Sequence, residues 1–293
     1  MIRLAVMSDI HNEFESPTHS GDDWFALRDA RRAIPDHPEI GPLLDDLAGQ
    51  SIDLVVMAGD IDLEDRGIAY TDKVSSYVGA PVVCVMGNRE SYTGRDMDAI
   101  VSDLRAGAGA TNGRVTFLEN EKATYDLPAG RLYVLGCTLW TDYALNGAET
   151  VEQAMLDCAD LNDHTHIQWK GDRFLPAHAR QLHETSRQWL AREVGAIRAA
   201  EGDGATIIIV THHAPILDSI DPQFRSGKLS PAFASDLHAE IREWKPAAWL
   251  FGHTHHSVDL MIDNTRMLSV QRGFVCQDPG AERFRPVVVE IHP

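Results

Sequence analysis

The chain has 293 residues, 44% of them hydrophobic, so it can bury a substantial core in one large domain or two small ones. Its formal net charge of −18, from 26 basic and 44 acidic residues, argues against a surface that binds long nucleic acid or an anionic membrane. Phosphorylated substrates are not excluded, because bound metal ions can locally outweigh the global charge.

The four cysteines show no CxxC spacing, which indicates reduced thiols. The apolar stretch after Met1 is too short for a signal peptide, contains Arg3 and runs directly into Asp9. No stretch approaches the length of a membrane span. We therefore expect a soluble, cytoplasmic protein.

Strands and helices alternate in the first part of the chain. Apolar, β-branched runs predict strands at 2–8, 52–57 and 82–85, and helical spacing predicts helices at 40–47, 65–78 and 96–104. The segment 19–38 departs from this rhythm and carries Trp24 and Phe25, so we expect it to cover part of a cleft. Three consecutive strands follow, at 115–118, 123–127 and 132–139, with Pro128-Ala129-Gly130 as a turn.

The second part of the chain contains longer helical patterns and a second group of strands. Helices are predicted at 148–160 and 177–200, the latter with an apolar face that is typical of core packing. Ser230 and Pro231 predict the start of a helix at 232–244. Strands are predicted at 207–210, 248–251, 258–262, 267–270 and 287–291. No linker is evident, so we expect one domain over residues 1–293.

Short polar clusters follow five of the predicted strands. Ligands of α/β folds gather just past the carboxyl ends of the strands, so these clusters can meet at one place. Together they supply two carboxylates, one amide and up to five imidazoles. The clusters are Asp9-Ile10-His11, Gly59-Asp60, Gly87-Asn88-Arg89-Glu90, His212-His213 and Gly252-His253-Thr254-His255.

This set of donors suits borderline divalent metals such as Mn, Fe, Co, Ni or Zn. Residues i and i+2 of a strand point the same way, so Asp9 and His11 reach one ion together if the extended conformation continues past the strand. The same holds for His253 and His255. The sequence therefore predicts a site for two divalent ions.

The ordered set DxH, GD, GN, H and GHTH resembles the calcineurin-like metallophosphoesterase superfamily over nearly the whole chain. The stretches LGCTLWTDY, VTHHAP and GHTHH resemble a bacterial, largely uncharacterised branch of it. The resemblance implies an α/β fold, a four-layer sandwich of two mixed β-sheets flanked by helices. It also implies a binuclear site in which Mn is the first choice of metal and Fe, Zn, Ni and Co are alternatives.

Transferred onto this sequence, the resemblance assigns a ligand role to seven residues. Asp9, His11 and His255 would hold one ion, Asn88, His212 and His253 the other, and Asp60 would bridge the two. His212 is preferred to His213 because it stands three residues before Pro215, as in the family's HxxP pattern, which leaves His213 as a supporting residue. Alternation along the chain turns His256 away from His255, so we expect no ligand role for it.

Arg89 departs from the family pattern, in which Gly-Asn is usually followed by a histidine that aids the leaving group. Arginine is not a general acid near neutral pH, because its pKa exceeds about 12. It can instead supply a fixed positive charge and a two-pronged contact with phosphate oxygens. Gly-Asn-Arg-Asp also occurs in the UDP-diacylglucosamine hydrolases, which the rest of the chain does not resemble. An exposed Arg89 paired with Glu90 is the alternative interpretation.

The resulting hypothesis is hydrolysis of a small phosphodiester or phosphomonoester, with the diester favoured, by a hydroxide that bridges two ions about 3.5–4 Å apart. We expect Asp60, Asn88 and Arg89 to take part in catalysis, and neither a membrane nor a long nucleic acid as a partner. The rival hypothesis, favoured by Arg89, is a weakly catalytic or non-catalytic metal-binding protein that recognises a phosphorylated ligand. The polar residues Asn162, Asp163, His164 and His166 are predicted to form a solvated loop.

Overall fold

The computed structural model describes residues 1–14, 44–47, 49–275, 277–278 and 280–292. The predicted cleft-covering segment 19–38 and the first half of the predicted helix 40–47 lie outside these residues. The described end of that helix is the short 3₁₀ turn η2 (Asp45–Leu47).

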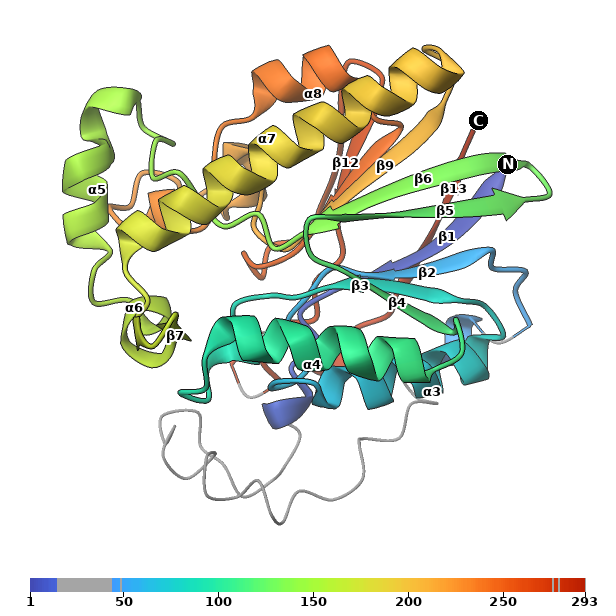
Figure 1. The fold of residues 1–293 in the computed structure, drawn as a ribbon, viewed down its shortest axis with the longest axis horizontal. Coiled ribbons are helices and arrows are strands. Elements are labelled where there is room, and N and C mark those ends of the chain that lie inside the picture. Colours follow the sequence, from blue (N-terminus) through green and yellow to red (C-terminus); the bar gives the residue numbers. More distant parts are fainter. Residues whose placement is uncertain (15–43, 48, 276, 279, 293) are drawn as a thin grey trace.

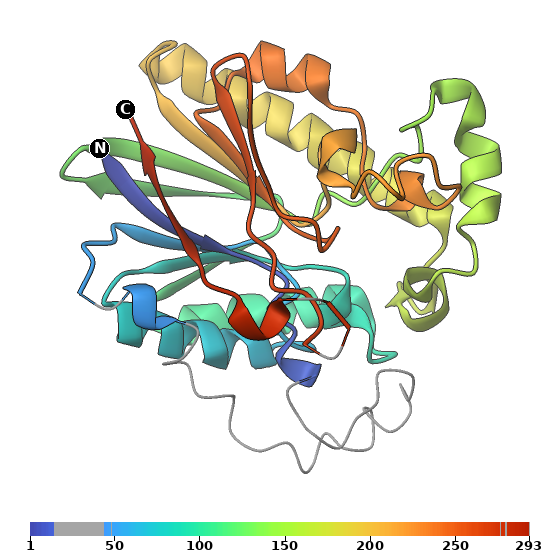
Figure 2. The same ribbon diagram turned by 180° about the vertical axis from the view of Figure 1, so that it is seen from behind.

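The first sheet contains five strands in the order β13-β1-β2-β3-β4. Its four parallel members are β1 (Ile2–Met7), β2 (Leu54–Met57), β3 (Val82–Val85) and β4 (Val115–Leu118), and β13 (Val287–Ile291) runs antiparallel to β1. Because Ile2 pairs with Ile291, the two ends of the described chain lie side by side (Figure 2). The apolar runs of β1 to β3 are almost wholly buried, as expected for parallel strands covered on both faces.

The second sheet contains six strands in the order β11-β12-β10-β9-β6-β5. The central strands β6 (Gly130–Cys137), β9 (Thr206–Thr211), β10 (Ala248–Phe251) and β12 (Thr265–Ser269) are parallel. The edge strands β5 (Glu121–Leu127) and β11 (Val258–Ile262) are antiparallel to their neighbours. Both large sheets are therefore mixed, as the resemblance implied.

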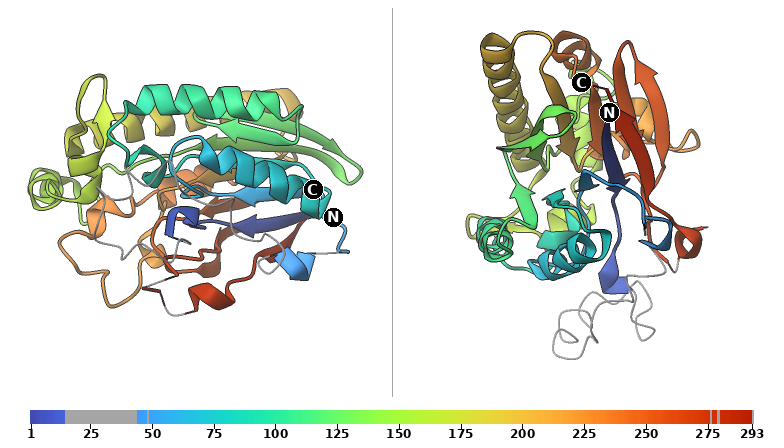
Figure 3. Two further views of the ribbon diagram at one scale, coloured as in Figure 1. Left: turned by 90° about the horizontal axis from the view of Figure 1, so that it is seen from below. Right: turned by 90° about the vertical axis from the view of Figure 1, so that its right-hand side faces the viewer.

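Helices cover the outer face of each large sheet, which produces the four expected layers (Figure 1). Helices α3 (Arg66–Val78) and α4 (Met97–Ala110) lie on the first sheet, and α7 (Pro176–Glu201) and α8 (His238–Trp244) lie on the second. In the right panel of Figure 3, α7 (gold) lies at the upper left and α3 and α4 (teal) lie at the lower left, with green strands between them. The sequence predicts α3 and α7 to within one residue at each end, whereas the predicted helix 96–104 is too short, because α4 continues to Ala110.

Alternation along β9 explains how the layers pack. Ile208 and Val210 belong to the apolar cluster between the sheets, whereas Ile207 and Ile209 pack with α7 and α8. The predicted apolar face of α7 is confirmed as core, with Leu190 and other members of its stripe buried against this sheet. Residues at i and i+2 of a strand share one face, so a single run of buried residues serves both layers.

The predicted helix at 232–244 is wrong over its first half. Ser230 begins only a 3₁₀ turn, η6 (Ser230–Ala232), and α8 starts at His238. The Ser230 hydroxyl donates to the Phe224 carbonyl instead of capping a helix, and Ala234 forms a β-bridge with Ala214. Both contacts hold the chain away from a helical path.

A smaller group of elements lies beyond the carboxyl ends of the parallel strands. It contains α5 (Val151–Asp157), α6 (Asn162–His166) and the short hairpin of β7 (Gln168–Trp169) and β8 (Asp172–Arg173). The sequence did not predict α6 or this hairpin. Short 3₁₀ turns complete the described fold: η1 (Asn12–Phe14), η3 (Arg89–Ser91), η4 (Ala148–Thr150), η5 (Leu217–Ser219) and η7 (Ala281–Arg283).

Candidate metal centre

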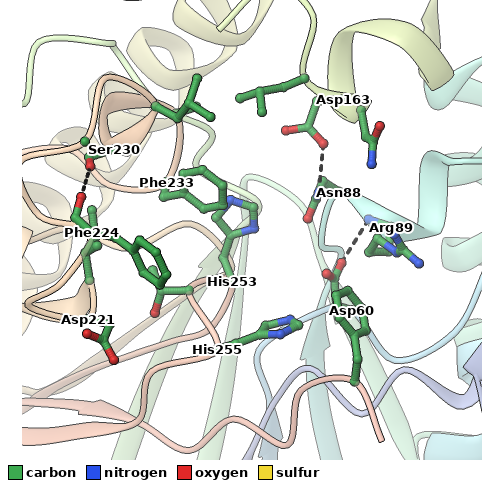
Figure 4. A pocket seen from close by; sticks show the side chains of 18 of the residues that line it. Asp60, Asn88, Arg89, Asp163, Asp221, Phe224, Ser230, Phe233, His253 and His255 are labelled. Carbon is green, nitrogen blue, oxygen red and sulfur yellow. Dashed lines mark hydrogen bonds between the residues drawn. The ribbon is translucent and has the colours of Figure 1, made fainter. Parts of the chain in front are cut away.

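The five polar clusters follow β1, β2, β3, β9 and β10, and the structure brings them together at one edge of the two sheets. Figure 4 shows four side chains from three of these clusters, Asp60, Asn88, His253 and His255, facing a common space. Parallel strands end at the same edge of a sheet, so the topology brings together the clusters that follow β1, β2 and β3 and, in the other sheet, those that follow β9 and β10.

The backbone at the clusters does not continue the strands. Five of the predicted ligands have positive φ angles between 49° and 75°: Asp9, His11, Asp60, His253 and His255. The expectation that an extended conformation aims Asp9 and His11 at one ion is therefore wrong in its geometry, although the side chains do converge. Left-handed backbone is uncommon outside glycine and recurs at functional sites, where the surrounding fold enforces it.

The glycines of the motifs make room for the acidic side chains. A Cβ atom on Gly87 would lie 2.0 Å from Asp60 Oδ1, and one on Gly252 would lie 2.5 Å from Asp9 Oδ2. Each glycine thus lets a buried carboxylate approach the backbone closely. In the Gly87-Asn88 and Gly252-His253 pairs, the glycine is therefore required for packing, and the second residue is the predicted ligand.

The first ligand group consists of Asp9, His11 and His255. The Nε2 atoms of His11 and His255 are 3.1 Å apart, and Asp9 Oδ1 lies 3.7 Å from His255 Nε2. The Nδ1 atoms of the two imidazoles face carboxylates, Glu13 at 3.0 Å and Asp278 at 2.8 Å. Donation to those carboxylates leaves an unprotonated Nε2 on each ring, so two lone pairs face each other.

The second group consists of Asp60, His212 and His253, with Asn88 beside it. His212 Nε2 lies 3.0 Å from Asn88 Oδ1 and 3.2 Å from His253 Nδ1. His212 Nδ1 donates to the Ala58 carbonyl at 2.9 Å, and the His253 ring has a hydrogen bond with the Ala232 backbone. Three acceptor atoms without protons therefore converge here too, and such an arrangement fits a cation, because lone pairs at this distance repel one another.

Asp60 lies between the two groups. Its Oδ2 is 3.7 Å from His11 Nε2, and its Oδ1 is 3.5 Å from His212 Nε2. The backbone N–H of Arg89 donates to Oδ1 at 2.9 Å and fixes the carboxylate. One oxygen toward each group is the orientation that a bridging ligand requires.

Burial shifts the acid–base properties of these groups in opposite directions. It raises the pKa of Asp9 to about 6 and, helped by the charges of Glu90 and Asp9, raises the pKa of Asp60 well above its usual value. Burial lowers the pKa of His11 to about 4, and burial with neighbouring imidazoles lowers that of His253 well below its usual value. Neutral imidazoles are the form that binds metal, and closely packed carboxylates favour a cation.

Arg89 is buried, so the alternative of an exposed residue paired with Glu90 is wrong. Its Nε donates to Glu13 Oε1 at 3.3 Å, and its guanidinium carbon lies 4.8 Å from the ring centre of Phe14 and 4.9 Å from that of Tyr92. Glu90 instead accepts from backbone N–H groups. The aromatic rings and Glu13 hold the cation at the edge of the metal centre.

The two histidines without a predicted ligand role lie outside both ligand groups. His213 faces the Thr138 carbonyl through Nδ1, and its ring packs 4.1 Å from that of His253 between centres, which is consistent with a supporting role. His256 lies 3.8 Å from Asp221.

Asp163 is the main residue that the sequence reasoning missed. The predicted solvated loop is wrong, because 162–166 form α6 and Asp163 and His164 are buried. Asp163 Oδ1 accepts from Asn88 Nδ2 at 2.8 Å and from the Tyr92 hydroxyl. The amide nitrogen of Asn88 is thereby fixed, and its oxygen points toward His212. Glu13 and Asp278, which orient imidazoles, were missed as well.

A pocket of about 860 Å³ opens above the two ligand groups. Asp60, Asn88, Arg89, His253 and His255 contribute to its lining. The rest of the wall comes from 160–163, from the loop 220–233 and from Phe14, Tyr92, Thr254, Phe274 and Gln277. This space is large enough for an organic substrate as well as a phosphate group.

Comparison with known proteins supports the assignment of this centre. The family described as calcineurin-like phosphoesterase matches residues 2–257. No curated protein sequence matches the chain. None of the helices in the described part of the chain has the length and apolar character needed to span a membrane.

Two solved structures of similar fold are informative. A phosphopantetheinyl hydrolase from Mycobacterium tuberculosis shares 18% identity at a TM-score of 0.62, over 97% of this chain and 95% of that one. A dimetal phosphatase from Danio rerio shares 13% identity at a TM-score of 0.50, over 99% of this chain and 93% of that one. At these identities the likeness shows the fold.

Proposed function

The chain belongs to the calcineurin-like phosphoesterase family, and we propose that it is a binuclear metal-dependent phosphoesterase that prefers phosphodiesters to phosphomonoesters. The observation that carries the proposal is the position of Asp60, with one carboxylate oxygen toward His11 and the other toward His212. The unprotonated acceptors that converge on either side of it supply the rest of two ligand sets. Manganese is our first choice of metal.

Two divalent ions bound there would activate a water molecule as the nucleophile and neutralise charge on the phosphoryl oxygens. The chain's own residues prepare the site. Glu13 and Asp278 fix the tautomers of His11 and His255, and the Arg89 N–H holds the Asp60 carboxylate in place. Ligands held this firmly need little rearrangement during the reaction.

Arg89 supports phosphate binding from the side of the centre. Its guanidinium is confined by Phe14 and Tyr92 and lines the pocket, so it can contact a phosphoryl oxygen at little entropic cost. Arginine does not release a proton near neutral pH, so its contribution is electrostatic.

The preference for diesters rests on charge and space. A phosphomonoester carries nearly two negative charges at pH 7, whereas a diester carries one. Glu13 shares the charge of Arg89, and Asp163 lies close by, so the protein adds little net positive charge to that of the ions. The pocket of about 860 Å³ also leaves room for the second organic group of a diester.

The test uses metal-stripped protein to which Mn, Fe, Co, Ni or Zn is restored separately. We expect metal-dependent hydrolysis of bis(4-nitrophenyl) phosphate at a higher kcat/KM than that of 4-nitrophenyl phosphate. Asp60→Ala should abolish turnover and lower the content of both ions in elemental analysis. Metal binding and phosphate binding without any turnover would favour the rival hypothesis of a binding protein.

A further inference from the structure

The pocket above the ligand groups has an apolar wall on the side opposite Arg89, with Asp221 and Ser230 beside it. Figure 4 shows Arg89 and Asp163 on one side and Phe224 and Phe233 across from them, with His253 between. The apolar side comes from the loop between η5 and η6 and from the residue that follows η6. Its main members are Ile220, Phe224, Leu229 and Phe233.

Phe224 and Leu229 are exposed although the loop that carries them is well ordered by its own hydrogen bonds. Phe224 is 61% exposed and Leu229 is 43% exposed. The Phe224 carbonyl accepts from the Gly227 N–H at 2.8 Å and from the Ser230 hydroxyl at 2.5 Å. The fold therefore holds an aromatic ring in the pocket opening, where a ligand can cover it.

The apolar wall is continuous with the metal centre. The Phe233 ring stacks on His253, with ring centres 5.1 Å apart and an angle of 26° between the planes. A phosphate held beside His253 would therefore place its attached organic group first against Phe233 and then against Phe224 and Leu229.

The charges around the pocket indicate which organic group fits. Charged residues other than the predicted ligands and Arg89 also line the pocket in its described part. Three of them are acidic, Asp160, Asp163 and Asp221, and one is basic, Lys228. This excess of acidic groups repels a second phosphate or a carboxylate on the substrate. A neutral group meets no such repulsion and gains from covering the apolar wall.

Building on the phosphoesterase function above, we propose that the substrate is a phosphodiester with one uncharged, mainly apolar alcohol component, and that Phe224, Leu229 and Phe233 bind this component. Polyanionic substrates such as nucleotide chains are disfavoured by the same wall. The wall thus determines which diester is hydrolysed, while the metal centre determines the reaction.

Three synthetic diesters test this assignment: the methyl, hexyl and 5-carboxypentyl esters of 4-nitrophenyl phosphate. Each methylene group buried on the wall is worth about fourfold in binding. With partial burial of the chain, we expect kcat/KM for the hexyl ester to exceed that for the methyl ester at least tenfold. The 5-carboxypentyl ester should lose most of this gain, because its charge faces the acidic residues.

Phe224→Ala should lower the hexyl-to-methyl ratio at least threefold, because it removes the exposed ring of the wall. Met261→Ala is the matched control, since Met261 is 58% exposed on β11 and does not line the pocket, and it should leave the ratio unchanged. Equal rates for the methyl and hexyl esters, or an unchanged ratio in Phe224→Ala, would overturn the assignment. Equal rates for the hexyl and 5-carboxypentyl esters would overturn its charge component.

Calorimetric binding of methylphosphonate and hexylphosphonate to the manganese-loaded protein separates this inference from the proposed function. Tighter binding of hexylphosphonate that is lost in Phe224→Ala supports the wall even if no ester is hydrolysed, in which case the phosphoesterase proposal fails alone. Hydrolysis of the diesters with equal binding of the two phosphonates would refute the wall and leave the phosphoesterase proposal intact.

Discussion

Asp163→Leu should selectively weaken binding of the ion that we propose Asn88, His212 and His253 hold. Asp163 contacts Asn88 directly, because the amide nitrogen of Asn88 donates to it at 2.8 Å. Without this acceptor the amide can rotate, and its oxygen is no longer fixed toward His212. The first ligand group, which includes Asp9 and His11, has no such dependence on α6.

The magnitude follows from the contacts of the Asn88 amide. Loss of a group that orients a metal ligand typically costs 10- to 100-fold in metal affinity, or about 1.4–2.7 kcal/mol. The Tyr92 hydroxyl remains 3.1 Å from Asn88 Nδ2, so some orientation survives. We therefore expect a loss of about tenfold for one ion. Asp163→Asn retains a carbonyl acceptor and should lose less than about threefold.

The assay is calorimetric titration of metal-stripped protein with Mn²⁺, which resolves two binding steps. Thermal unfolding of the metal-free variants controls for damage to the fold, because Asp163 is only 8% exposed. Equal weakening of both steps, or equal losses in Asp163→Leu and Asp163→Asn, would refute the role assigned to this carboxylate.

Three further predictions concern other parts of the molecule. Arg89→His should raise turnover of alkyl esters more than that of 4-nitrophenyl esters, at unchanged metal content. A histidine can act as a general acid, and such assistance is worth about 10²–10⁴-fold for poor leaving groups. Equal changes for the two kinds of ester would contradict this. Burial raises the pKa of Glu119 to about 7 despite hydrogen bonds from Thr138, so the folded state binds a proton more tightly than the unfolded chain. The contribution of Glu119 to stability should therefore rise as the pH falls from about 7 to about 4.5. In urea unfolding, the free energy of unfolding of the wild type relative to Glu119→Gln should rise over the same range. Gly136→Ala should lower the free energy of unfolding by about 1–3 kcal/mol in the same assay, because the new Cβ would lie 2.6 Å from Leu118 Cβ. Gly109→Ala on α4 is the control: its Cβ would meet nothing within 4 Å, so it should not destabilise the fold.

The sequence predicts the parts of this molecule that depend on local pattern. Buried strands such as β3 are short apolar runs, and each predicted ligand stands just past such a run, so strand order and motif order together indicate the centre. The family resemblance supplied the division of the ligands into two groups, and the structure places Asp60 between them.

The remainder depends on tertiary contacts that local pattern does not encode. Asp163 is 75 residues from Asn88, and only the packing of α6 across the strand ends brings them together. Ser230 followed by proline is a good helix start, yet its hydroxyl has a closer partner in the Phe224 carbonyl. The backbone of His11 and His255 is left-handed, and each N–H donates to a residue far away in the sequence, Asp60 and Gln271 respectively, which no local signal indicates.

The most direct test of the central claim is a stoichiometric titration. Metal-stripped protein, at a concentration well above the dissociation constants, receives Mn²⁺ in fractions of an equivalent while hydrolysis of bis(4-nitrophenyl) phosphate is followed. The two ligand groups on either side of Asp60 predict that activity is absent without metal and reaches its plateau at two equivalents per chain. A plateau at one equivalent, or hydrolysis by the metal-free protein, would contradict a binuclear metal-dependent phosphoesterase.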